Sequence, residues 1–395
     1  MGSQEDVSTR NQPAALVTDA SERVALHVIR ALGRKGVRVQ AVEVEGRSPK
    51  PIGFLSRYTK QASMIPSWET SAEAWLEGLL SLGQPGDVLI PVCLNAVLRV
   101  LAHREALAER FRFLLPPESV LRRANDKGEL YQLACQLGIP VPRMYSSRNE
   151  DEASEVAESI VYPAIVKPRN DEDLYLPAQA RWRKVESPAE LLGAWRRFHA
   201  VQSEPVIQEF IQGAAYGFEG LYDADGSLVA TCSHRRLMEY PTPGGPSAVC
   251  ESVWDARLEE LGRRLLDSLG WRGVAMAQFH RSDETGEFFL LEVNPRFWGS
   301  LPLAEAAGVN FPHMLYRAAL RESVAPVSYH AGVRMRLLPT YLLSVCRAVR
   351  NRPWALGHWL PKLSYLLDPR VHEGLCCLDD LRPALQYLAQ RSRGV

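Results

Sequence analysis

The stretch from Phe288 to Ser300, with the sequence FFLLEVNPRFWGS, places polar side chains within an apolar strand. Glu292 and Asn294 are two residues apart, so their side chains leave an extended strand on the same face. A carboxylate in a half-buried strand is costly unless positive charge meets it, and Mg²⁺ takes oxygen ligands of these types. Arg296 adds a planar fork suited to phosphate or carboxylate. The alternative is a solvated strand end with an acid–arginine pair.

A third oxygen donor precedes this stretch. The segments Val274–His280 and Glu287–Val293 are expected to form a hairpin across the turn at 282–286. Strict alternation then predicts two sets that each share a face: Val274, Met276 and Gln278 on the first strand, and Phe288, Leu290, Glu292 and Asn294 on the second. The amide of Gln278 offers an oxygen ligand, so one hairpin could bring three donors together, unless the matching parity of Gln278 is chance.

Composition excludes several classes of protein. The 395 residues predict two or three domains, and 46 basic residues balance 46 acidic ones, which does not favour nucleic acid as a partner. Seven scattered cysteines without a CxxC pair indicate a reducing compartment rather than a disulfide framework or a zinc site. No run approaches the ~20 apolar residues of a membrane span. The polar start, MGSQEDVSTRNQP, lacks signal-peptide features. We therefore expect a cytoplasmic protein with a disordered tail at 1–13.

The next hundred residues indicate a parallel α/β unit. Two apolar strands, Ala14–Thr18 and Val37–Val44, flank a segment with helical spacing. The turn after the first strand has no GxGxxG, so a Rossmann-type dinucleotide cofactor is not expected, and a structural or substrate-facing unit is favoured. The pattern further predicts helices at Thr70–Leu82 and Asn95–Ala108, with strands at Asp87–Val92 and Phe113–Leu115.

Alternating helices and strands continue to about residue 330. Gly226 in the turn Asp223–Gly226 gives a strong hairpin signal between Phe218–Tyr222 and Leu228–Ser233. The other expected elements are helices over 127–137, Glu150–Ser159, Pro188–Ala200 and Asp255–Leu269, and strands over Tyr162–Lys167 and Val206–Ile211.

The order of these parts resembles the ATP-grasp superfamily over roughly residues 14 to 325. The residues that carry the resemblance are NDKGELYQLACQLGIPVP (125–142), YPAIVKPR (162–169), VIQEFIQG (206–213) and GVAMAQFHRSDETGEFFLLEVNPRFWGSLPLAEAAGVNFP (273–312). The resemblance implies an α/β chain with an α+β lid: a tail at 1–13, a Rossmann-like pre-ATP-grasp domain at 14–118, a lid subdomain at 119–212, a large subdomain with the metal site at 213–330, and a helical C-terminal extension at 331–395.

The resemblance also implies roles for single residues. Lys127 and Lys167 resemble the lysines that contact the nucleotide phosphates, and Glu219 loosely matches a position near the ribose. Glu292 and Asn294 resemble ligands that hold Mg²⁺ (Mn²⁺ being possible) against the triphosphate of ATP. Arg296 resembles the arginine that stabilises the transferred phosphoryl group or an acyl phosphate. The adenine edge would meet the backbone of the hinge residues Glu209, Phe210 and Ile211.

Two departures from the superfamily pattern stand out. Gln278 occupies a position where most relatives have an acid, although carbamoyl-phosphate synthases are similar in using glutamine there. The segment after Lys167, PRNDEDLYLPAQARW, lacks a glycine-rich phosphate loop, which leaves lid closure open. The Gly244-Gly245 loop either borders the acceptor site or is an ordinary connection.

The chemistry implied is phosphoryl transfer from ATP to a carboxylate, followed by attack of an amine on the acyl phosphate. Arg235 or Arg236 would bind the carboxylate or the intermediate, unless both face solvent, and His234 is a candidate base or a structural histidine. Carbamoyl-phosphate-synthase-like chemistry and a non-catalytic ATP-binding module are the alternatives. Loops near residues 20, 57, 95, 244 and 299, including Trp298, Gly299 and Ser300, are expected to shape the acceptor pocket.

The C-terminal part, from Val333 to Val395, matches nothing in the superfamily pattern. Its segment Thr340–Leu367 is rich in Leu, Trp and Tyr and contains basic but no acidic residues before Asp368. Packing on the rest of the chain or a homodimer interface is favoured, and contact with an anionic membrane surface is the alternative. The expected partners are otherwise a small-molecule carboxylate and an amine.

Overall fold

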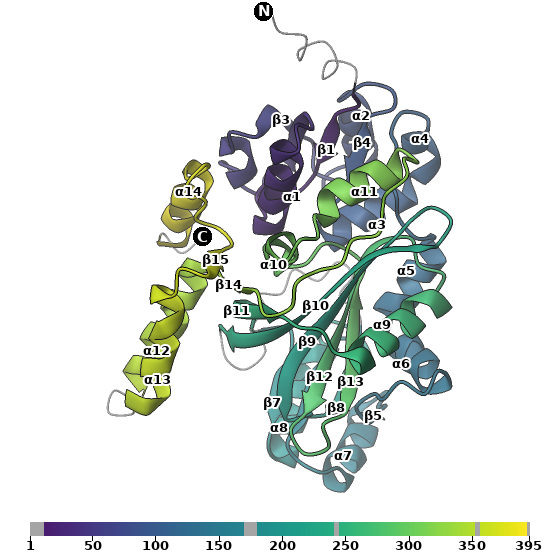
Figure 1. Cartoon of the computed structure of the whole chain (residues 1–395). Helices are drawn as coiled ribbons and strands as arrows, with labels where there is room; N and C mark the ends of the chain where they lie inside the picture. Colours follow the sequence, from purple (N-terminus) through teal and green to yellow (C-terminus); the bar gives the residue numbers. More distant parts are fainter. Residues whose placement is uncertain (1–11, 170–179, 241–244, 352–355, 393–395) are drawn as a thin grey trace, which may run out of the picture.

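The computed structural model describes residues 12–169, 180–240, 245–351 and 356–392 of the chain. These residues form three sheets with helices packed around them (Figure 1). The expected tail at 1–13 lies outside the described residues except for its last two positions, as do most of the segment after Lys167 and the first glycine of the Gly244-Gly245 loop. The mixed α/β class predicted from the sequence is confirmed.

The N-terminal sheet is four-stranded and entirely parallel, in the order β3-β2-β1-β4. Its strands are β1 (Ala15–Val17), β2 (Val39–Val44), β3 (Thr59–Ile65) and β4 (Val88–Ile90). The helical elements of this part are α1 (Arg23–Arg34), η2 (Ile52–Leu55), α2 (Ala72–Leu80), α3 (Leu94–Ala102) and α4 (Arg104–Ala108).

Three sequence predictions for this part were wrong. Strand β3 was missed because most of its side chains are exposed at the sheet edge, so it has no buried apolar run. The single helix expected at 95–108 is broken at His103, whose backbone leaves the helical region. No strand forms at Phe113–Leu115 in the described structure; instead Arg112 makes one isolated bridge to Val88.

A small antiparallel sheet follows, in the order β5-β8-β6-β7. It comprises β5 (Met144–Tyr145), β6 (Ala164–Lys167), β7 (Arg183–Val185) and β8 (Val206–Glu209), and the helices of this region are α5 (Glu118–Asn125), α6 (Lys127–Gln136), α7 (Glu150–Ser159) and α8 (Pro188–His199). Side-chain caps explain where three of these helices begin: Asp126, Asn149 and Ser187 each accept a backbone N–H of the first turn.

The large sheet has seven strands in the order β13-β12-β9-β10-β11-β14-β15. Its first five are β9 (Gly213–Tyr222), β10 (Leu228–Glu239), β11 (Ser247–Ser252), β12 (Gly273–Ser282) and β13 (Phe288–Asn294), and the hairpin predicted across Asp223–Gly226 is confirmed. Helix α9 (Ala256–Ser268) packs on the sheet, and α10 (Leu301–Ala306) and α11 (Phe311–Ala319) follow β13. A Cβ at Gly262 would lie 2.2 Å from Cγ of Phe218, so only glycine permits α9 to approach β9 this closely.

A bulge between β12 and β13 changes which side chains share a face. Gln278 pairs with Glu292, but Phe279 pairs with Leu290, so Leu291 is the extra residue. Phe288 and Leu290 consequently lie in the core with Val293, whereas Glu292 and Asn294 line cavities on the other side. The prediction that all four even-numbered residues share one face was therefore wrong, although Gln278, Glu292 and Asn294 do face the same cavity.

The C-terminal segment adds strands to the large sheet as well as helices. It contains β14 (Arg334–Arg336), α12 (Leu338–Asn351), α13 (Leu356–Leu367), β15 (Val371–Glu373) and α14 (Arg382–Ser392). Strand β14 pairs with β11, and β15 pairs in parallel with β14. The extension at 331–395, expected to be helical, is thus of mixed structure. The strand pairing was missed because three-residue strands carry almost no periodic signal.

A buried ion pair ties the C-terminal segment to the N-terminal sheet. Arg30 of α1 is fully buried, and its Nε donates to the carboxylate of Asp380 at 2.9 Å. The same carboxylate accepts from Ser56 Oγ at 2.7 Å and from the backbone N–H of Arg57 at 2.9 Å. Helix α12 also packs on β10 and β11 through the buried Tyr341. Among the described residues, no helix has the length and apolar character needed to cross a membrane.

Candidate active site

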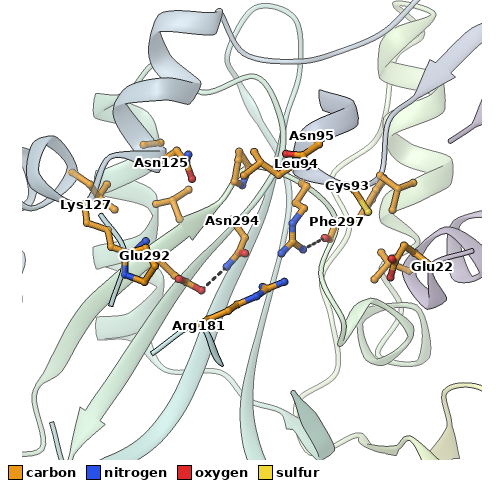
Figure 2. Close-up of a pocket in the computed structure, with 18 of the residues that line it drawn as sticks. Glu22, Cys93, Leu94, Asn95, Asn125, Lys127, Arg181, Glu292, Asn294 and Phe297 are labelled. Atoms are coloured by element: carbon orange, nitrogen blue, oxygen red, sulfur yellow. Dashed lines mark hydrogen bonds between the residues drawn. The ribbon is translucent and has the colours of Figure 1, made fainter. Parts of the chain in front are cut away.

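Two adjoining cavities lie where β12 and β13 face the smaller sheet and the N-terminal sheet. One has a volume of about 430 Å³ and the other about 600 Å³, and Lys127, Glu292, Asn294 and Arg296 line both. In Figure 2, Lys127 and Glu292 lie on one side of the first cavity, Glu22 and Cys93 on the opposite side, and Arg181 and Asn294 between them. The cavity therefore runs from the large sheet to the N-terminal α/β unit.

The oxygen donors predicted from the sequence come together at the β12–β13 hairpin. The side-chain N–H of Asn294 donates to Glu292 Oε1 at 3.2 Å, and Gln278 lies directly across from Glu292 in the strand register. Gln278 Oε1 accepts from Arg236 Nη2 at 2.9 Å. One carboxylate with neighbouring amide oxygens, in a cavity also lined by cations, fits Mg²⁺ shared with phosphates. Glu292 and Asn294 are the residues that would hold the metal, with Gln278 engaged by Arg236 in this arrangement.

The two predicted lysines line the larger cavity together with Arg181. Lys127 is the first residue of α6, where the helix N-terminus favours anions, and its side chain is buried. The preceding residue, Asp126, caps this helix and pairs with Arg169 at 2.9 Å. Burial raises the pKa of Asp126. The backbone N–H groups and Arg169 lower that pKa by more, so the net pKa lies below its usual value. The position of Lys127 is therefore set by the start of α6, which Asp126 and Arg169 hold in place.

The three predicted hinge residues are placed differently from one another. Phe210 lines the larger cavity, and the ammonium of Lys184 lies 4.9 Å from its ring centroid. Glu209 ends β8, and its carboxylate accepts the backbone N–H of Arg143 at 3.1 Å. The carbonyl oxygen of Ile211 lies 3.3 Å from Nδ1 of His280, a second cavity residue. Among these side chains, the cavity wall includes only that of Phe210.

Arg235 and Arg236 point to opposite faces of β10. Arg236 lines the larger cavity and contacts Gln278, and its Nη1 lies 3.5 Å from Glu239. Arg235 instead donates twice to Glu251, which also pairs with Arg334 of β14. Because neighbouring strand residues alternate, only one of the two can face the cavity, and the structure places Arg236 there.

Part of this chain matches a known protein family. A family described as "ATP-grasp in the biosynthetic pathway with Ter operon" matches residues 205–340. This part of the chain is an ATP-grasp domain. The matched region covers β8 to the start of α12 and therefore includes the hairpin with Gln278, Glu292 and Asn294.

Curated proteins that this chain resembles include a synthase section and a ligase. The carbamoyl phosphate synthase large chain, N-terminal section, of Methanopyrus kandleri is 29% identical over 194 residues, 47% of this chain and 34% of that protein. The D-alanine–D-alanine ligase of Ectopseudomonas mendocina is 29% identical over 222 residues, 51% of this chain and 66% of that protein. The chain thus spans less than two thirds of each relative's length.

The fold of the ATP-grasp chain is shared with a solved ADP complex of PurK, an N5-carboxyaminoimidazole ribonucleotide synthetase. The TM-score is 0.65 at 12% identity, over 86% of this chain and 85% of that one. At this identity the likeness concerns the fold alone. Because it covers most of both chains, the shared fold extends beyond the residues of the family match.

A buried polar cluster lies behind the wall of the ATP-grasp cavity. Nδ1 of His234 lies 2.8 Å from Oε1 of Glu219, in a geometry that does not form a hydrogen bond. Ser300 Oγ lies 3.3 Å from that carboxylate oxygen and from Nε2 of His234. Burial raises the pKa of Glu219. A Cβ at Gly217 would lie 2.5 Å from the imidazole. Neither Glu219 nor His234 lines the two cavities, so a ribose contact or a base role has no direct support from this geometry.

The sequence reasoning named the loops near residues 20, 57 and 95 of the N-terminal unit, but not the loop after β2 that holds Arg47. Four side chains of this unit line the smaller cavity opposite the β12–β13 hairpin: Glu22, Arg47 and Cys93 from the segments after β1, β2 and β4, and Asn95 from the start of α3. Ser344 and Lys362 of the C-terminal helices line the larger cavity. None of these residues shares a local pattern with another, so only their convergence in space reveals them. All seven cysteines lie in described segments and are unpaired.

Proposed function

We propose that this chain is an ATP-dependent carboxylate–amine ligase that forms a C–N bond and releases ADP and phosphate. The observation that carries the proposal is the convergence of Lys127, Lys167 and Arg296 with Glu292 and Asn294 around adjoining cavities. Phosphoryl transfer requires little more from a protein than positioning and charge compensation around the phosphates.

In the first step, a carboxylate oxygen attacks the γ-phosphorus of ATP. A P–O bond to the substrate forms, the bond between the β- and γ-phosphates breaks, and ADP leaves. In this proposal Lys127 and Lys167, which line the larger cavity, hold phosphate oxygens, and Arg296 offers its fork to the acyl phosphate. Mg²⁺, or Mn²⁺ in its place, would supply Lewis-acid neutralisation of phosphate charge when held by Glu292 and Asn294.

In the second step, the amine nitrogen attacks the acyl carbon. The C–N bond forms, the C–O bond to phosphate breaks, and the amine loses a proton to solvent. Arg236 and Arg296 line the cavity where negative charge must be held. We assign Arg236 rather than Arg235 to the substrate side, since Arg235 is engaged by Glu251 on the other face of the sheet.

A second candidate is carbamoyl-phosphate-synthase-like chemistry, in which bicarbonate is the activated acid. Gln278 opposite Glu292 and the relative from Methanopyrus kandleri favour it. A third is a nucleotide-binding module without turnover.

The deciding experiment measures ADP release by purified protein with MgATP and a panel of carboxylates and amines, with mass spectrometry of the products. Substrate-dependent ADP release with an amide product supports the ligase. ADP release with bicarbonate and ammonia alone favours the synthase-like reaction. Nucleotide binding without ADP release from any mixture supports the binding module.

The proposal extends to the setting of the enzyme. We propose a cytoplasmic protein that acts on small molecules and forms a homodimer, with no role for nucleic acid. The buried contacts of Tyr341 and Val345 support packing of α12 on the chain itself rather than on a membrane. Light scattering after size-exclusion chromatography tests the dimer, and sedimentation with anionic vesicles tests membrane contact.

A further inference from the structure

The two lysines proposed for the phosphates belong to two differently packed parts of the chain. Lys167 is the last residue of β6, whose sheet packs with α7 and α8 around a core that includes Trp195 and Ile207. Lys127 begins α6, whose apolar side chains, such as that of Leu130, join the core of the large sheet. The separation of the two ammonium groups is therefore set by contacts between these parts rather than by either core alone.

A guanidinium joins the two parts next to both lysines. Arg169 follows Lys167 by two residues, and its Nε donates to Oδ2 of Asp126 at 2.9 Å. Asp126 directly precedes Lys127, and its other carboxylate oxygen, Oδ1, accepts two backbone N–H groups of the first turn of α6 at 2.8 and 3.0 Å. The carboxylate thus caps the helix with one oxygen and receives the arginine with the other.

Arg169 is itself held in place by the segment before β8. Its Nη1 donates to Oε2 of Glu204 at 3.2 Å, and its backbone N–H donates to Oε1 of Gln202 at 2.7 Å. The φ of Glu204, 54°, lies in the left-handed region, which is uncommon for residues other than glycine. Such conformations persist where the surrounding structure imposes them. Arg169 therefore meets Asp126 from a position that two further side chains define.

The ion pair lies beside the phosphate site without lining it. Neither Arg169 nor Asp126 is among the described residues that line the two site cavities, whereas both lysines line the larger one. Arg169 and Glu204 instead line a separate cavity of about 1030 Å³. The side chains of Arg169 and Asp126 are 42% and 22% exposed, and pairs this exposed contribute little to folding stability. We therefore expect the pair to act on the position of the lysines rather than on the stability of the fold.

We propose that Arg169 is a positioning residue, whose ion pair with Asp126 holds the small antiparallel sheet and α6 so that Lys127 and Lys167 face the same phosphate groups. Cations that are already in place bind a polyanion more tightly, because less conformational freedom is lost on binding. This inference rests on the proposed use of ATP. It assigns part of the affinity for the triphosphate to an ion pair outside the two site cavities.

The test compares the affinity of the full chain for MgATP with its affinity for adenosine, which carries no phosphate. Calorimetry measures the first and ligand-observed NMR the second. Arg169→Met should raise the Kd for MgATP about 10-fold and change the Kd for adenosine less than about twofold, because the lysines act on the phosphates. Retained adenosine binding also shows that the variant is folded. Arg169→Lys, which keeps the charge without the fork, should restore part of the loss.

Asp126→Asn separates the ion pair from the helix cap, because asparagine caps helices about as well as aspartate does. This change should also weaken MgATP binding about 10-fold, and adding Arg169→Met to it should cause little further loss. Arg196→Met is the matched control, because Arg196 pairs with Glu150 between α8 and α7, within one part, and both side chains are about half exposed. The Kd of this control for MgATP should equal that of the unaltered protein.

The positioning role is overturned if Arg169→Met leaves the MgATP affinity unchanged, if it weakens adenosine binding equally, or if its effect and that of Asp126→Asn are additive. An equal loss in the Arg196→Met control, or an unaltered chain that binds no ATP, would also refute it. ATP binding that depends on Arg169, without ADP release from any substrate mixture, would support the positioning role and refute the ligase.

Discussion

The two ends of the smaller cavity are built in different ways. At the large-sheet end, Glu292, Asn294 and Arg296 come from one strand and its continuation, so their spacing is fixed by the strand itself. At the other end, Glu22, Arg47 and Cys93 come from three loops that follow β1, β2 and β4. The parallel sheet brings these loops to one edge, because the carboxyl ends of parallel strands lie on the same side.

We expect this difference to separate the residues that act in the reaction from those that select the substrate. A hairpin register tolerates little variation, because a one-residue slip turns every side chain to the other face. Loops accept substitution more readily, and binding residues concentrate on them. We therefore expect changes at the hairpin to abolish turnover and changes at the loops to alter which substrate is used.

Glu292→Ala should have the largest effect of the substitutions considered, and the effect should be on turnover. Loss of the only carboxylate in the proposed metal seat should reduce turnover at least about 1000-fold, with no change in the circular dichroism spectrum. Glu287→Ala is the control, since this residue is exposed in the same hairpin. An active Glu292→Ala protein would show that the hairpin carboxylate is not needed for turnover. It would contradict the proposed division of roles between the two ends.

Asp380→Asn should lower the free energy of unfolding, because Asp380 joins the C-terminal segment to α1 of the N-terminal unit. The change leaves Arg30 buried without its charged partner, which typically costs about 3–5 kcal/mol. Urea denaturation measures the loss. Asp379→Asn breaks a half-exposed pair with Arg34 and should cost under about 1 kcal/mol. Equal losses in the two variants would show that the buried pair does not fasten the C-terminal segment to α1.

Arg236→Met tests whether the residues around the hairpin act in the reaction, because it removes the group that contacts Gln278. We expect kcat/KM to fall about 10- to 100-fold. Arg235→Met is the matched control on the same strand, and its activity should stay within about twofold, because Arg235 faces Glu251. A larger effect of the Arg235 change in the activity assay would reverse the assignment of faces.

The smallest expected effect is on the pH dependence of stability. It involves Glu251, on the face of the large sheet away from the cavities. Burial raises the pKa of Glu251, but Arg235 and Arg334 lower it more, to a net decrease below 4.5. A depressed pKa contributes stability that is present above the unfolded value and is lost as pH falls through the folded value. Thermal unfolding of the unaltered protein should thus lose stability below about pH 4.5 more steeply than that of Glu251→Gln. Parallel pH curves would contradict this linkage.

Much of the fold could be predicted from sequence where periodic patterns are strong. Helix α7 has the predicted bounds, and the hairpin at Asp223–Gly226 was predicted from its turn residues. Weakly patterned elements were not found: the exposed edge strand β3 and the short β14 and β15 give no apolar alternation. The bulge at Leu291 was also missed, because an inserted residue breaks the period on which the prediction depends.

The sequence by itself predicted the ATP-grasp resemblance and the candidate residues Lys127, Lys167, Glu292, Asn294 and Arg296, which the structure brings together around the cavities. These residues lie within contiguous blocks whose residue types and spacing constrain their surroundings. Tertiary structure alone decided that Arg236 rather than Arg235 faces the cavity, that Glu219, His234 and Ser300 form a buried cluster behind it, and that Arg47 is clasped by Asp19. The physical reason is the range of the interactions. Strand register acts between neighbours in sequence, whereas the clasp and the cluster join residues that only the packing of distant segments brings within hydrogen-bonding distance.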